Sequence, residues 1–482
     1  MKVGKVLPVA GLLVLIAGCS VGPKYVRPSV PVAPLYKETP PASFKEADGW
    51  KPAQPGDEAI RGKWWEMFRD SRLNALEEQI NVSNQTLKVA EARFRQARAA
   101  IRFNRAAQFP SISAAPSISR EAVSANSPFR PAGARRNGSD FVLPFDLSYE
   151  VDLWGRVRKS VESAREEFQA TAADLESVRL SLHAELGVDY FELRSLDEQK
   201  RILDEAVSAY ERALQLTRNR FEGGAAAAAE VAQAETQLQM TRAQNIDVGV
   251  QRAQYEHAIG LLTGQPPEAV SVPFGPLKAE PPSVPVGVPS ELLERRPDIA
   301  AAERRVASAN EQVGIAKTAF FPALVLGATG GFEGTSIASL FNWPSRLWAV
   351  GPSMLQTVFD GGRRRAVSES ALANYDATIA EYRETSLSAF KEVEDNLAAL
   401  RILEQETSAQ RAAVVAAQRS LELSTNRYRG GLVTYLEVVT AQSTALANER
   451  TEADLMRRRM DASVLLIKAL GGGWNAAQLP KG

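Results

Sequence analysis

The chain has almost none of the residues from which metal sites and disulfides are usually built. Its 482 residues include one cysteine, Cys19, and two histidines, His183 and His257. These are too few for a disulfide or for the usual nitrogen and sulfur metal clusters. We interpret both histidines as polar residues on helix surfaces, and we expect neither a metal nor a cofactor.

Net charge and catalytic motifs are absent as well. Lys plus Arg and Asp plus Glu both number 57, so no bulk charge attracts nucleic acid. The sequence has no Gly-x-Ser-x-Gly elbow, no phosphate loop ending Gly-Lys-Ser/Thr and no His-Glu-x-x-His. Its carboxylates alternate with Arg and Lys, as on a solvated helix face. We therefore expect no catalytic residues and a protein that is not an enzyme.

The N-terminus has the layout of a secretory signal. Lys2 and Lys5 precede the apolar residues 7–17, a run too short to span a membrane. The run ends in Leu-Ile-Ala-Gly-Cys19, which resembles the bacterial lipobox, where the cysteine thiol takes a diacylglyceryl group. Ser20 follows instead of Asp, and in Gram-negative lipoproteins this pattern predicts the outer membrane. The alternative is an ordinary signal in which the cysteine is incidental.

The segment after the cysteine is predicted to be extended. Residues 19–41 are rich in proline and valine, a composition that disfavours helix. We interpret this segment as a tether between a lipid on Cys19 and the body of the protein.

One set of motifs occurs twice, which predicts an internal repeat. An upstream set recurs at a spacing of 212, and a downstream set recurs at a spacing of 207. The five-residue difference falls between Pro110 and Gly155, so the halves differ mainly in a loop there. The downstream pairs include Asn219-Arg220 with Asn426-Arg427, Gly223-Gly224 with Gly430-Gly431, and Glu230-Val231 with Glu437-Val438.

Each half also contains a very long stretch that favours helix. Residues 155–219 contain no proline, and residues 363–429 contain neither proline nor glycine. At about 1.5 Å per residue, such a rod is on the order of 100 Å long. Spacings of four and three, typical of a coiled-coil seam, occur at Leu203, Val207, Tyr210, Leu214, Thr217 and Phe221.

The glycine pairs at 223–224 and 430–431 interrupt these rods, and helix-forming sequence resumes after each pair. Because glycine readily adopts the positive φ that reverses a chain, we expect two helical hairpins, each with its turn at a far tip. On the helices alone, a solvated coiled-coil stalk without a channel stays an alternative.

Strand-like alternation precedes each rod. Within residues 141–151 every odd position is apolar, whereas the even positions include Asp146, Ser148 and Glu150. One face therefore suits lipid and the other suits water, as in the wall of a membrane barrel. Residues 111–119 alternate likewise.

The second half shows weaker versions of this alternation in residues 323–332 and 347–359. We expect bulges or bends at three prolines within these strands, because proline removes a ladder donor. They are Pro116, Pro144 and Pro352.

Four strands per chain cannot close a barrel. An open sheet edge is not tolerated in hydrocarbon, where unpaired backbone groups cost several kcal/mol each. Bacterial barrels begin at about eight strands, so the chain must form oligomers, and both a dimer and a trimer are allowed.

The motifs resemble those of the outer-membrane factors, the TolC and OprM type, in their NodT-like lipoprotein branch. The resemblance covers essentially the whole mature chain. It rests on Cys19, Trp64-Trp65-Glu-Met-Phe68-Arg-Asp70, Asp152-Leu-Trp-Gly-Arg156, Asn219-Arg-Phe-Glu-Gly-Gly224, Leu355-Gln-Thr-Val-Phe-Asp-Gly-Gly-Arg363 and Asn426-Arg-Tyr-Arg-Gly-Gly-Leu432.

This resemblance implies a mostly α protein with a membrane β-barrel and an internal two-fold repeat. It also implies a homotrimer whose twelve-stranded outer-membrane barrel continues into a long periplasmic α-barrel. The expected parts are a signal peptide (1–18), a lipid-anchored extended tether (19–41), a first structural repeat (42–263), an equatorial linker (264–289), a second structural repeat (290–471) and a C-terminal tail (472–482).

The resemblance also implies a gate at the periplasmic end. The constricting acidic positions of the family fall on Glu437 and Thr440, their facing position on Glu230, and a tyrosine of the tip network on Tyr428. Thr440 occupies the position of a second acidic residue in the family, and Val433 occupies the position of an arginine that contacts the neighbouring helix. The alternative for Glu230 and Glu437 is a solvated carboxylate that suits the dipole of a helix start.

The implied function is the exit duct of a tripartite efflux system that conducts drugs or other small molecules. Its partners are outer-membrane lipid, a periplasmic adaptor and an inner-membrane pump of the resistance-nodulation-division class. A type I secretion channel for polypeptides and a periplasm-bridging structural lipoprotein are the alternatives. The residues expected to contact the adaptor are Gly223, Gly224, Gly430, Gly431 and Leu432.

Overall fold

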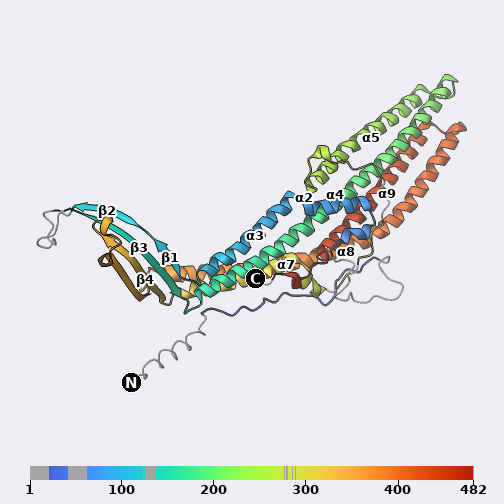
Figure 1. Ribbon diagram of the computed structural model, residues 1–482. Coiled ribbons are helices and arrows are strands. Elements are labelled where there is room, and N and C mark those ends of the chain that lie inside the picture. The colour runs from blue at the N-terminus through green and yellow to red at the C-terminus, as the bar shows by residue number, and fades with distance from the viewer. Residues whose placement is uncertain are drawn as a thin grey trace.

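The computed structural model describes residues 21–41, 62–122, 124, 137–275, 277, 280–284, 286–287 and 289–480. Over these residues the chain is mostly helical and elongated, with long helices side by side and a sheet at one end (Figure 1). None of the described helices combines the length and the hydropathy that a membrane-spanning helix requires. The predicted signal peptide and Cys19 lie outside the described residues.

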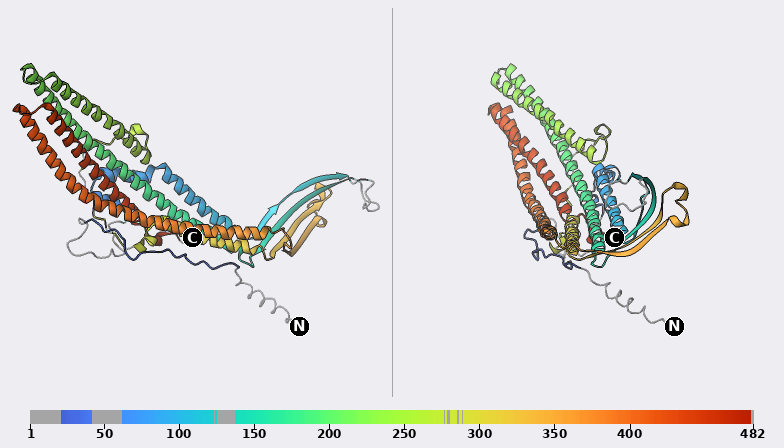
Figure 2. Two further views of the ribbon diagram at one scale, coloured as in Figure 1. Left: turned by 180° about the vertical axis from the view of Figure 1, so that it is seen from behind. Right: turned by 90° about the vertical axis from the view of Figure 1, so that its left-hand side faces the viewer.

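Two helices of 67 residues each, α4 (Arg156–Glu222) and α8 (Arg363–Arg429), run along the molecule. Each is followed by a 35-residue helix that returns alongside it, α5 (Ala228–Leu262) after α4 and α9 (Tyr435–Ala469) after α8 (Figure 2). At about 1.5 Å per residue, each long helix is on the order of 100 Å long. The two predicted helical hairpins are confirmed.

Glycines in the left-handed region begin and end the long helices. Gly155 and Gly362 precede α4 and α8 with φ of 84° and 93°, and Gly224 and Gly431 lie in the tip turns with φ of 73° and 72°. A side chain at such a φ would be strained, whereas glycine adopts it freely. The chain therefore reverses where the sequence predicts it.

The coiled-coil seam predicted on α4 is buried for most of its length. Leu203, Tyr210 and Leu214 are at most 6% exposed, but Phe221 at the tip end is 47% exposed. The last position of the predicted seam thus has no helix packed over it within one protomer.

Shorter helices pack against the long ones between their middle and the sheet (Figure 1). They are α2 (Ser71–Ser83), α3 (Gln85–Ala106), α6 (Leu292–Arg295) and α7 (Pro297–Thr318). The largest hydrophobic core lies here, where Trp64, Trp65 and Phe68 pack with Tyr190 and Phe191 of α4. From this level to the tips the two hairpins lie side by side (Figure 2), and they share a second hydrophobic cluster that includes Leu238, Tyr428 and Tyr435.

This core overturns one prediction from composition, because His183 is buried and not on a helix surface. It is 3% exposed and stacks on Trp65 with ring centroids 4.4 Å apart. Its Nδ1 lies 2.7 Å from a carboxylate oxygen of Glu77, which is fully buried. Burial lowers the pKa of His183 to about 4 and raises that of Glu77. The residue spacing within α4 could not predict that His183 is buried, because α2, a separate segment of the chain, covers it.

The sheet is antiparallel in the order β1-β3-β4-β5, and β2 also pairs with β3. Its strands are β1 (Ser111–Ala114), β2 (Ser117–Ala122), β3 (Asn137–Val151), β4 (Ala323–Gly334) and β5 (Arg346–Leu355). Since β1 and β2 pair with β3 in one continuous register, they form a single wall strand with an interruption. The fourth strand ends at Leu355 and not, as predicted, at Phe359.

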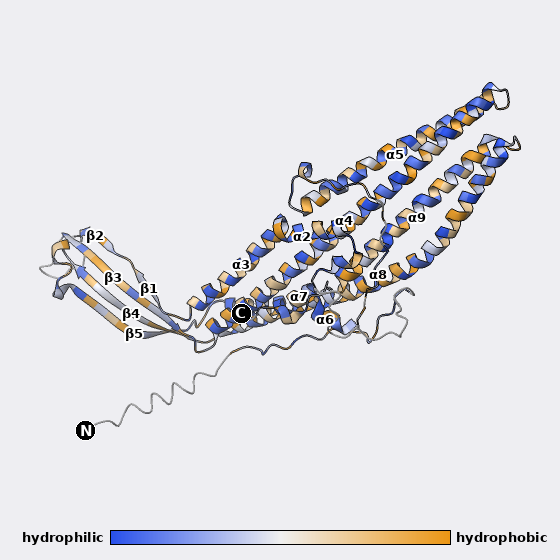
Figure 3. Ribbon diagram, turned by 45° about the vertical axis from the view of Figure 1, so that its right-hand side comes forward, coloured by the Kyte–Doolittle hydropathy of each residue, from blue (hydrophilic) through white to orange (hydrophobic). Residues whose placement is uncertain are grey.

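The register places most of the large apolar residues on one face, although Val142, Val325 and Leu347 lie on the other. On the face of Phe145, the neighbours across the sheet are Ala114, Gly330 and Trp348. Other apolar members of this face are Ile112, Ile118, Phe141, Leu143, Leu147, Tyr149, Val151, Leu324, Leu326, Ala328, Phe332, Val350, Pro352 and Met354. The opposite face carries Ser111, Ser113, Asp146, Ser148, Glu150, Thr329 and Ser353. Figure 3 shows the resulting alternation of hydropathy along the strands.

The three prolines behave differently from one another. Pro116 interrupts its strand as predicted, whereas the pairing register runs through Pro144 and Pro352 without a bulge. Pro144 lies beside the interruption between β1 and β2, where no pairing with β3 is needed. Pro352 lies on β5, an edge of the sheet, where proline is tolerated.

The predicted tether is extended over residues 21–41, and it is docked along the body of the protein. The backbone N–H groups of Lys37 and Glu38 donate to the two carboxylate oxygens of Glu394 on α8 at 2.7 and 2.9 Å. Nearer the sheet, the Tyr25 hydroxyl donates to Glu303 of α7. The segment is therefore a strap held by α7 and α8.

Candidate functional site at the hairpin tips

The residues expected to form the gate and the adaptor surface lie at the end of the molecule opposite the sheet. The two tip turns follow α4 and α8, and α5 and α9 begin just after them (Figure 1). Glu230 and Glu437 each lie in the first turn of the returning helix. Leu432 in the second turn is 75% exposed. Both turns thus present their surfaces to solvent in the single chain.

Tyr428 joins the two hairpins. It is 2% exposed, and its hydroxyl donates to a carboxylate oxygen of Glu230 at 3.0 Å. The same hydroxyl lies 3.4 Å from the hydroxyl of Thr217 on α4. Burial raises the pKa of Tyr428, so the phenol stays protonated as the donor. Two predicted gate residues are therefore in direct contact.

Arg220 is a further member of this contact to which sequence reasoning assigned no role. Its guanidinium donates to the backbone carbonyls of Tyr428 and Arg429, the latter at 3.2 Å, and lies 4.5 Å from the centroid of the Tyr428 ring. These carbonyls are at the C-terminal end of α8, where a cation is stabilised by the helix dipole. The signal in the sequence was the repeated Asn-Arg dipeptide, whose partner a linear pattern does not identify.

Within the described residues, the partners of Glu437 and Thr440 belong to their own hairpin. Glu437 pairs with Arg427 at 3.3 Å, and both side chains are about half exposed. The Thr440 hydroxyl donates to the carbonyl of Leu436 at 2.9 Å, within α9. The single chain therefore brings Glu230 and Tyr428 together and leaves Glu437 and Thr440 on an open surface.

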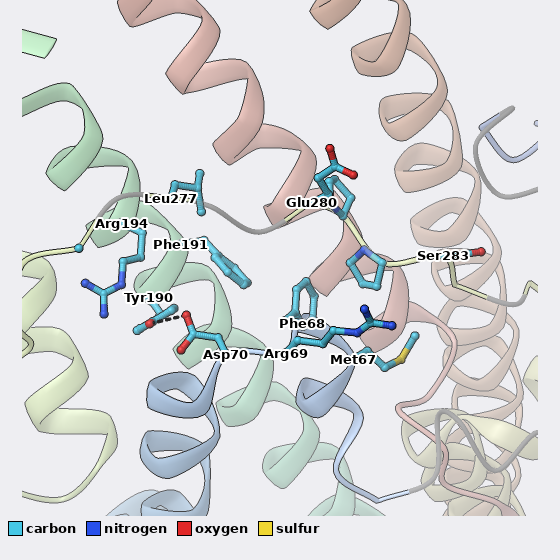
Figure 4. A pocket seen from close by; sticks show the side chains of 13 residues that line it. Met67, Phe68, Arg69, Asp70, Tyr190, Phe191, Arg194, Leu277, Glu280 and Ser283 are labelled. Atoms are coloured by element: carbon cyan, nitrogen blue, oxygen red, sulfur yellow. Dashed lines mark hydrogen bonds between the residues drawn. The ribbon is translucent and has the colours of Figure 1, made fainter. Parts of the chain in front are cut away.

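A second feature is a cavity of about 830 Å³ at the level of the central core. Its wall includes Phe68, Asp70, Tyr190 and Arg194 (Figure 4). The Asp70 carboxylate caps α2 and also accepts a hydrogen bond of 2.7 Å from the Tyr190 hydroxyl. These groups are already paired with one another, so the cavity wall serves the packing of α2 against α4.

The sequence matches the family described as outer membrane efflux protein over residues 76–265 and 288–472. The chain belongs to this family. It is accordingly an outer-membrane channel component of an efflux system and not an enzyme. Membership of this family excludes the alternative of a solvated coiled-coil stalk without a channel.

Individual relatives match nearly end to end. The probable efflux pump outer membrane protein TtgC of Pseudomonas putida is 31% identical over 463 residues, which are 95% of this chain and 94% of TtgC. The pyoverdine export outer membrane protein OpmQ of Pseudomonas aeruginosa is 33% identical over 420 residues, covering 86% and 88% of the two chains. The solved structure of the outer-membrane channel OprN matches with a TM-score of 0.84 at 30% identity, covering 95% of this chain and all of that one.

Proposed function

We propose that three copies of this chain form one continuous exit duct through the outer membrane. Each copy contributes four wall strands to a twelve-stranded barrel and two repeated helical hairpins to a periplasmic α-barrel. The sheet of a single copy ends in two open edges, β1–β2 and β5. Since open edges are excluded from hydrocarbon, pairing β5 of one copy with the first wall strand of the next removes them.

The observation that carries this proposal is the register of the sheet. Side chains from all the strands form one face that is mostly apolar and one that carries hydroxyl and carboxylate groups. In a barrel the apolar face contacts lipid and the polar face lines a water-filled lumen.

The tips are the periplasmic end of the duct in this proposal. Glu437, Thr440, Glu230 and Tyr428 form the gate. The adaptor contacts Gly223, Gly224, Gly430, Gly431 and Leu432, and it connects the duct to an inner-membrane pump of the resistance-nodulation-division class. The exposure of Leu432 supports a contact surface in this region.

The N-terminal strap supports a lipid anchor on Cys19. The strap begins where the N–H of Val21 donates to the carbonyl of Trp154 at 3.2 Å, at the junction between sheet and helices. Two residues before it, an acylated Cys19 would lie beside the membrane-facing end of the body. The segments 1–18, 19–41, 42–263, 264–289, 290–471 and 472–482 then act as signal, tether, first repeat, linker, second repeat and tail.

A matched pair of substitutions tests the barrel. Phe145 is 48% exposed on the apolar face, so Phe145→Arg places a cation toward lipid at a cost of about 2 to 4 kcal/mol per subunit. Ser148→Arg, on the polar face of the same strand, is expected to assemble normally. The measurement is the yield of membrane-inserted trimer and its conductance in a planar bilayer. Equal assembly of both variants, or the reverse order, would overturn the proposed register.

The class of molecule that the duct conducts can be tested through the phenotype of a deletion strain. TtgC is an efflux pump component and OpmQ a pyoverdine export protein by description, and small-molecule clients are proposed here by analogy. Deleting the chain should sensitise cells to small toxic compounds and leave polypeptide secretion intact. Loss of a secreted polypeptide with unchanged drug sensitivity would favour the type I secretion alternative.

A further inference from the structure

The first hairpin contacts the second through a set of residues that is repeated in the chain. The guanidinium of Arg220, near the end of α4, contacts the ring and carbonyl of Tyr428 and the carbonyl of Arg429, at the end of α8. Positions 207 residues away from these three are occupied by Arg427, Phe221 and Glu222. The helices that carry them, α4 and α8, both have 67 residues.

These counterpart residues do not make the same contact within one protomer. The side chain of Arg427 is 56% exposed and pairs only loosely with Glu437, at 3.3 Å. Phe221 is 47% exposed, whereas Tyr428 is 2% exposed. The second hairpin thus has an exposed cation, Arg427, and the first hairpin has an exposed ring, Phe221. A neighbouring protomer can bring such a pair together.

Hairpins that alternate around a ring meet at two kinds of seam. One lies between the two hairpins of a protomer, and the other lies between the second hairpin of one protomer and the first hairpin of the next. In such a ring, a rotation about the ring axis superposes the first hairpin on the second hairpin of the same protomer. The same rotation superposes the second hairpin on the first hairpin of the next protomer. The contact made by Arg220 is thereby carried onto Arg427.

We propose that Arg427 contacts the tip of a second copy of this chain, where it lies on the ring of Phe221 of the partner subunit and donates to the carbonyls of Phe221 and Glu222 of the partner subunit. This inference rests on the ring of three copies proposed above. A guanidinium suits the site because it has five donors, stacks on aromatic faces and complements the C-terminal end of a helix dipole.

One difference between the two seams is a hydroxyl group. Within a protomer, the Tyr428 hydroxyl donates to Glu230. Between protomers, the corresponding carboxylate is Glu437 and the corresponding ring is Phe221, which has no hydroxyl. The seam between subunits therefore lacks this hydrogen bond, and it is the seam that opens first when the tips separate.

Disulfide trapping tests the contact. Two differently tagged chains are co-expressed, one with Phe221→Cys and one with Arg427→Cys, so that a product carrying both tags joins two subunits. Oxidation should give this product in high yield. The matched control replaces Arg427→Cys by Arg419→Cys, which lies on the same helix about 12 Å farther from the tip and should give little product. Wild-type-like trimers without the Phe221–Arg427 product would overturn this inference and leave the proposed duct standing, whereas the absence of any trimer would overturn the duct itself.

Restoring the hydroxyl tests the difference between the seams. In Phe221→Tyr the new phenol should donate to Glu437 of the partner subunit and lower the basal open probability by about fivefold for one such bond. The effect should disappear in the Phe221→Tyr, Glu437→Ala double variant when compared with Glu437→Ala alone. An unchanged open probability in Phe221→Tyr, or an equal decrease in the absence of Glu437, would contradict the proposed seam.

Discussion

The two hairpin tips have related sequences and different surroundings. Each has an Asn-Arg dipeptide, an aromatic residue and a glycine pair. In the first tip, Arg220 reaches across to the second hairpin, while in the second tip Arg427 stays half exposed beside Glu437. The contacts of a repeated motif therefore depend on the helices that pack beside it. Within one protomer, each hairpin has the other hairpin on one side only.

The tips also differ in the composition of their turns. The first turn enters a run of alanines, residues 225–229, and offers no polar side chain between Gly224 and Glu230. The second turn continues with Leu432, Val433 and Thr434 before α9 begins. The first tip consequently depends on Arg220 and Glu230 for its polar contacts, and changes at these two positions should have the larger effects.

The largest expected effect follows from Arg220→Ala. This change removes the donors to the carbonyls of Tyr428 and Arg429 and the cation over the ring, and it should weaken the contact between hairpins by about 2 to 3 kcal/mol. Basal conductance in planar bilayers should rise, and tryptic cleavage at the second tip should become faster.

The matched control is Arg419→Ala, whose side chain is 63% exposed and pairs with Glu422 on the surface of α8. Such a pair is worth at most about 1 kcal/mol. If the two alanine variants have the same conductance and cleavage rate, the first tip depends on Arg220 no more than on a surface arginine, and the contrast between the tips fails.

A smaller effect is expected for Tyr428→Phe. The ring and its packing remain, but the hydrogen bond to Glu230 is lost, which costs about 1 kcal/mol. The substitution makes the second tip resemble the first, which has Phe221 at this position. Open probability should rise by about fivefold for one such bond.

The control is a double-mutant cycle with Glu230→Ala, in which Tyr428→Phe should have almost no further effect. Additive changes in open probability would show that the hydroxyl does not act through Glu230, and the proposed difference between the seams would lose its basis.

The smallest effect is expected for Glu437→Ala. Its ion pair with Arg427 is exposed and contributes at most about 1 kcal/mol. If three Glu437 carboxylates constrict the duct, their removal should raise basal conductance and shift the reversal potential toward weaker cation selectivity. Since Thr440 supplies no second acidic ring, the change should be modest.

The comparison for this variant is Glu422→Ala, another exposed acid paired with an arginine. Single-channel currents and reversal potentials for both variants are measured in one salt gradient. Indistinguishable behaviour would mean that Glu437 is only a charge at a helix start, and that closure relies on apolar or backbone contacts near Leu432.

Local rules in the sequence were enough to predict the elements of the fold. Uninterrupted helix formers over more than 60 residues predicted α4 and α8, and glycine pairs predicted the reversals at 223–224 and 430–431. Period-two alternation likewise predicted the apolar face that includes Phe145. Each of these features depends on residues close together in the chain, through backbone conformation or side-chain spacing.

Contacts between residues that are far apart in the chain depend instead on how the elements pack together. His183 became a buried partner of Glu77 because α2 covers it, and Pro144 stays within a strand because it lies beside the interruption at Pro116. Arg220 became the link between hairpins because the end of α8 places the backbone carbonyls of Tyr428 and Arg429 within its reach. The sequence determines spacing along each helix and strand, whereas burial and hydrogen bonding across more than 200 residues depend on how those elements pack.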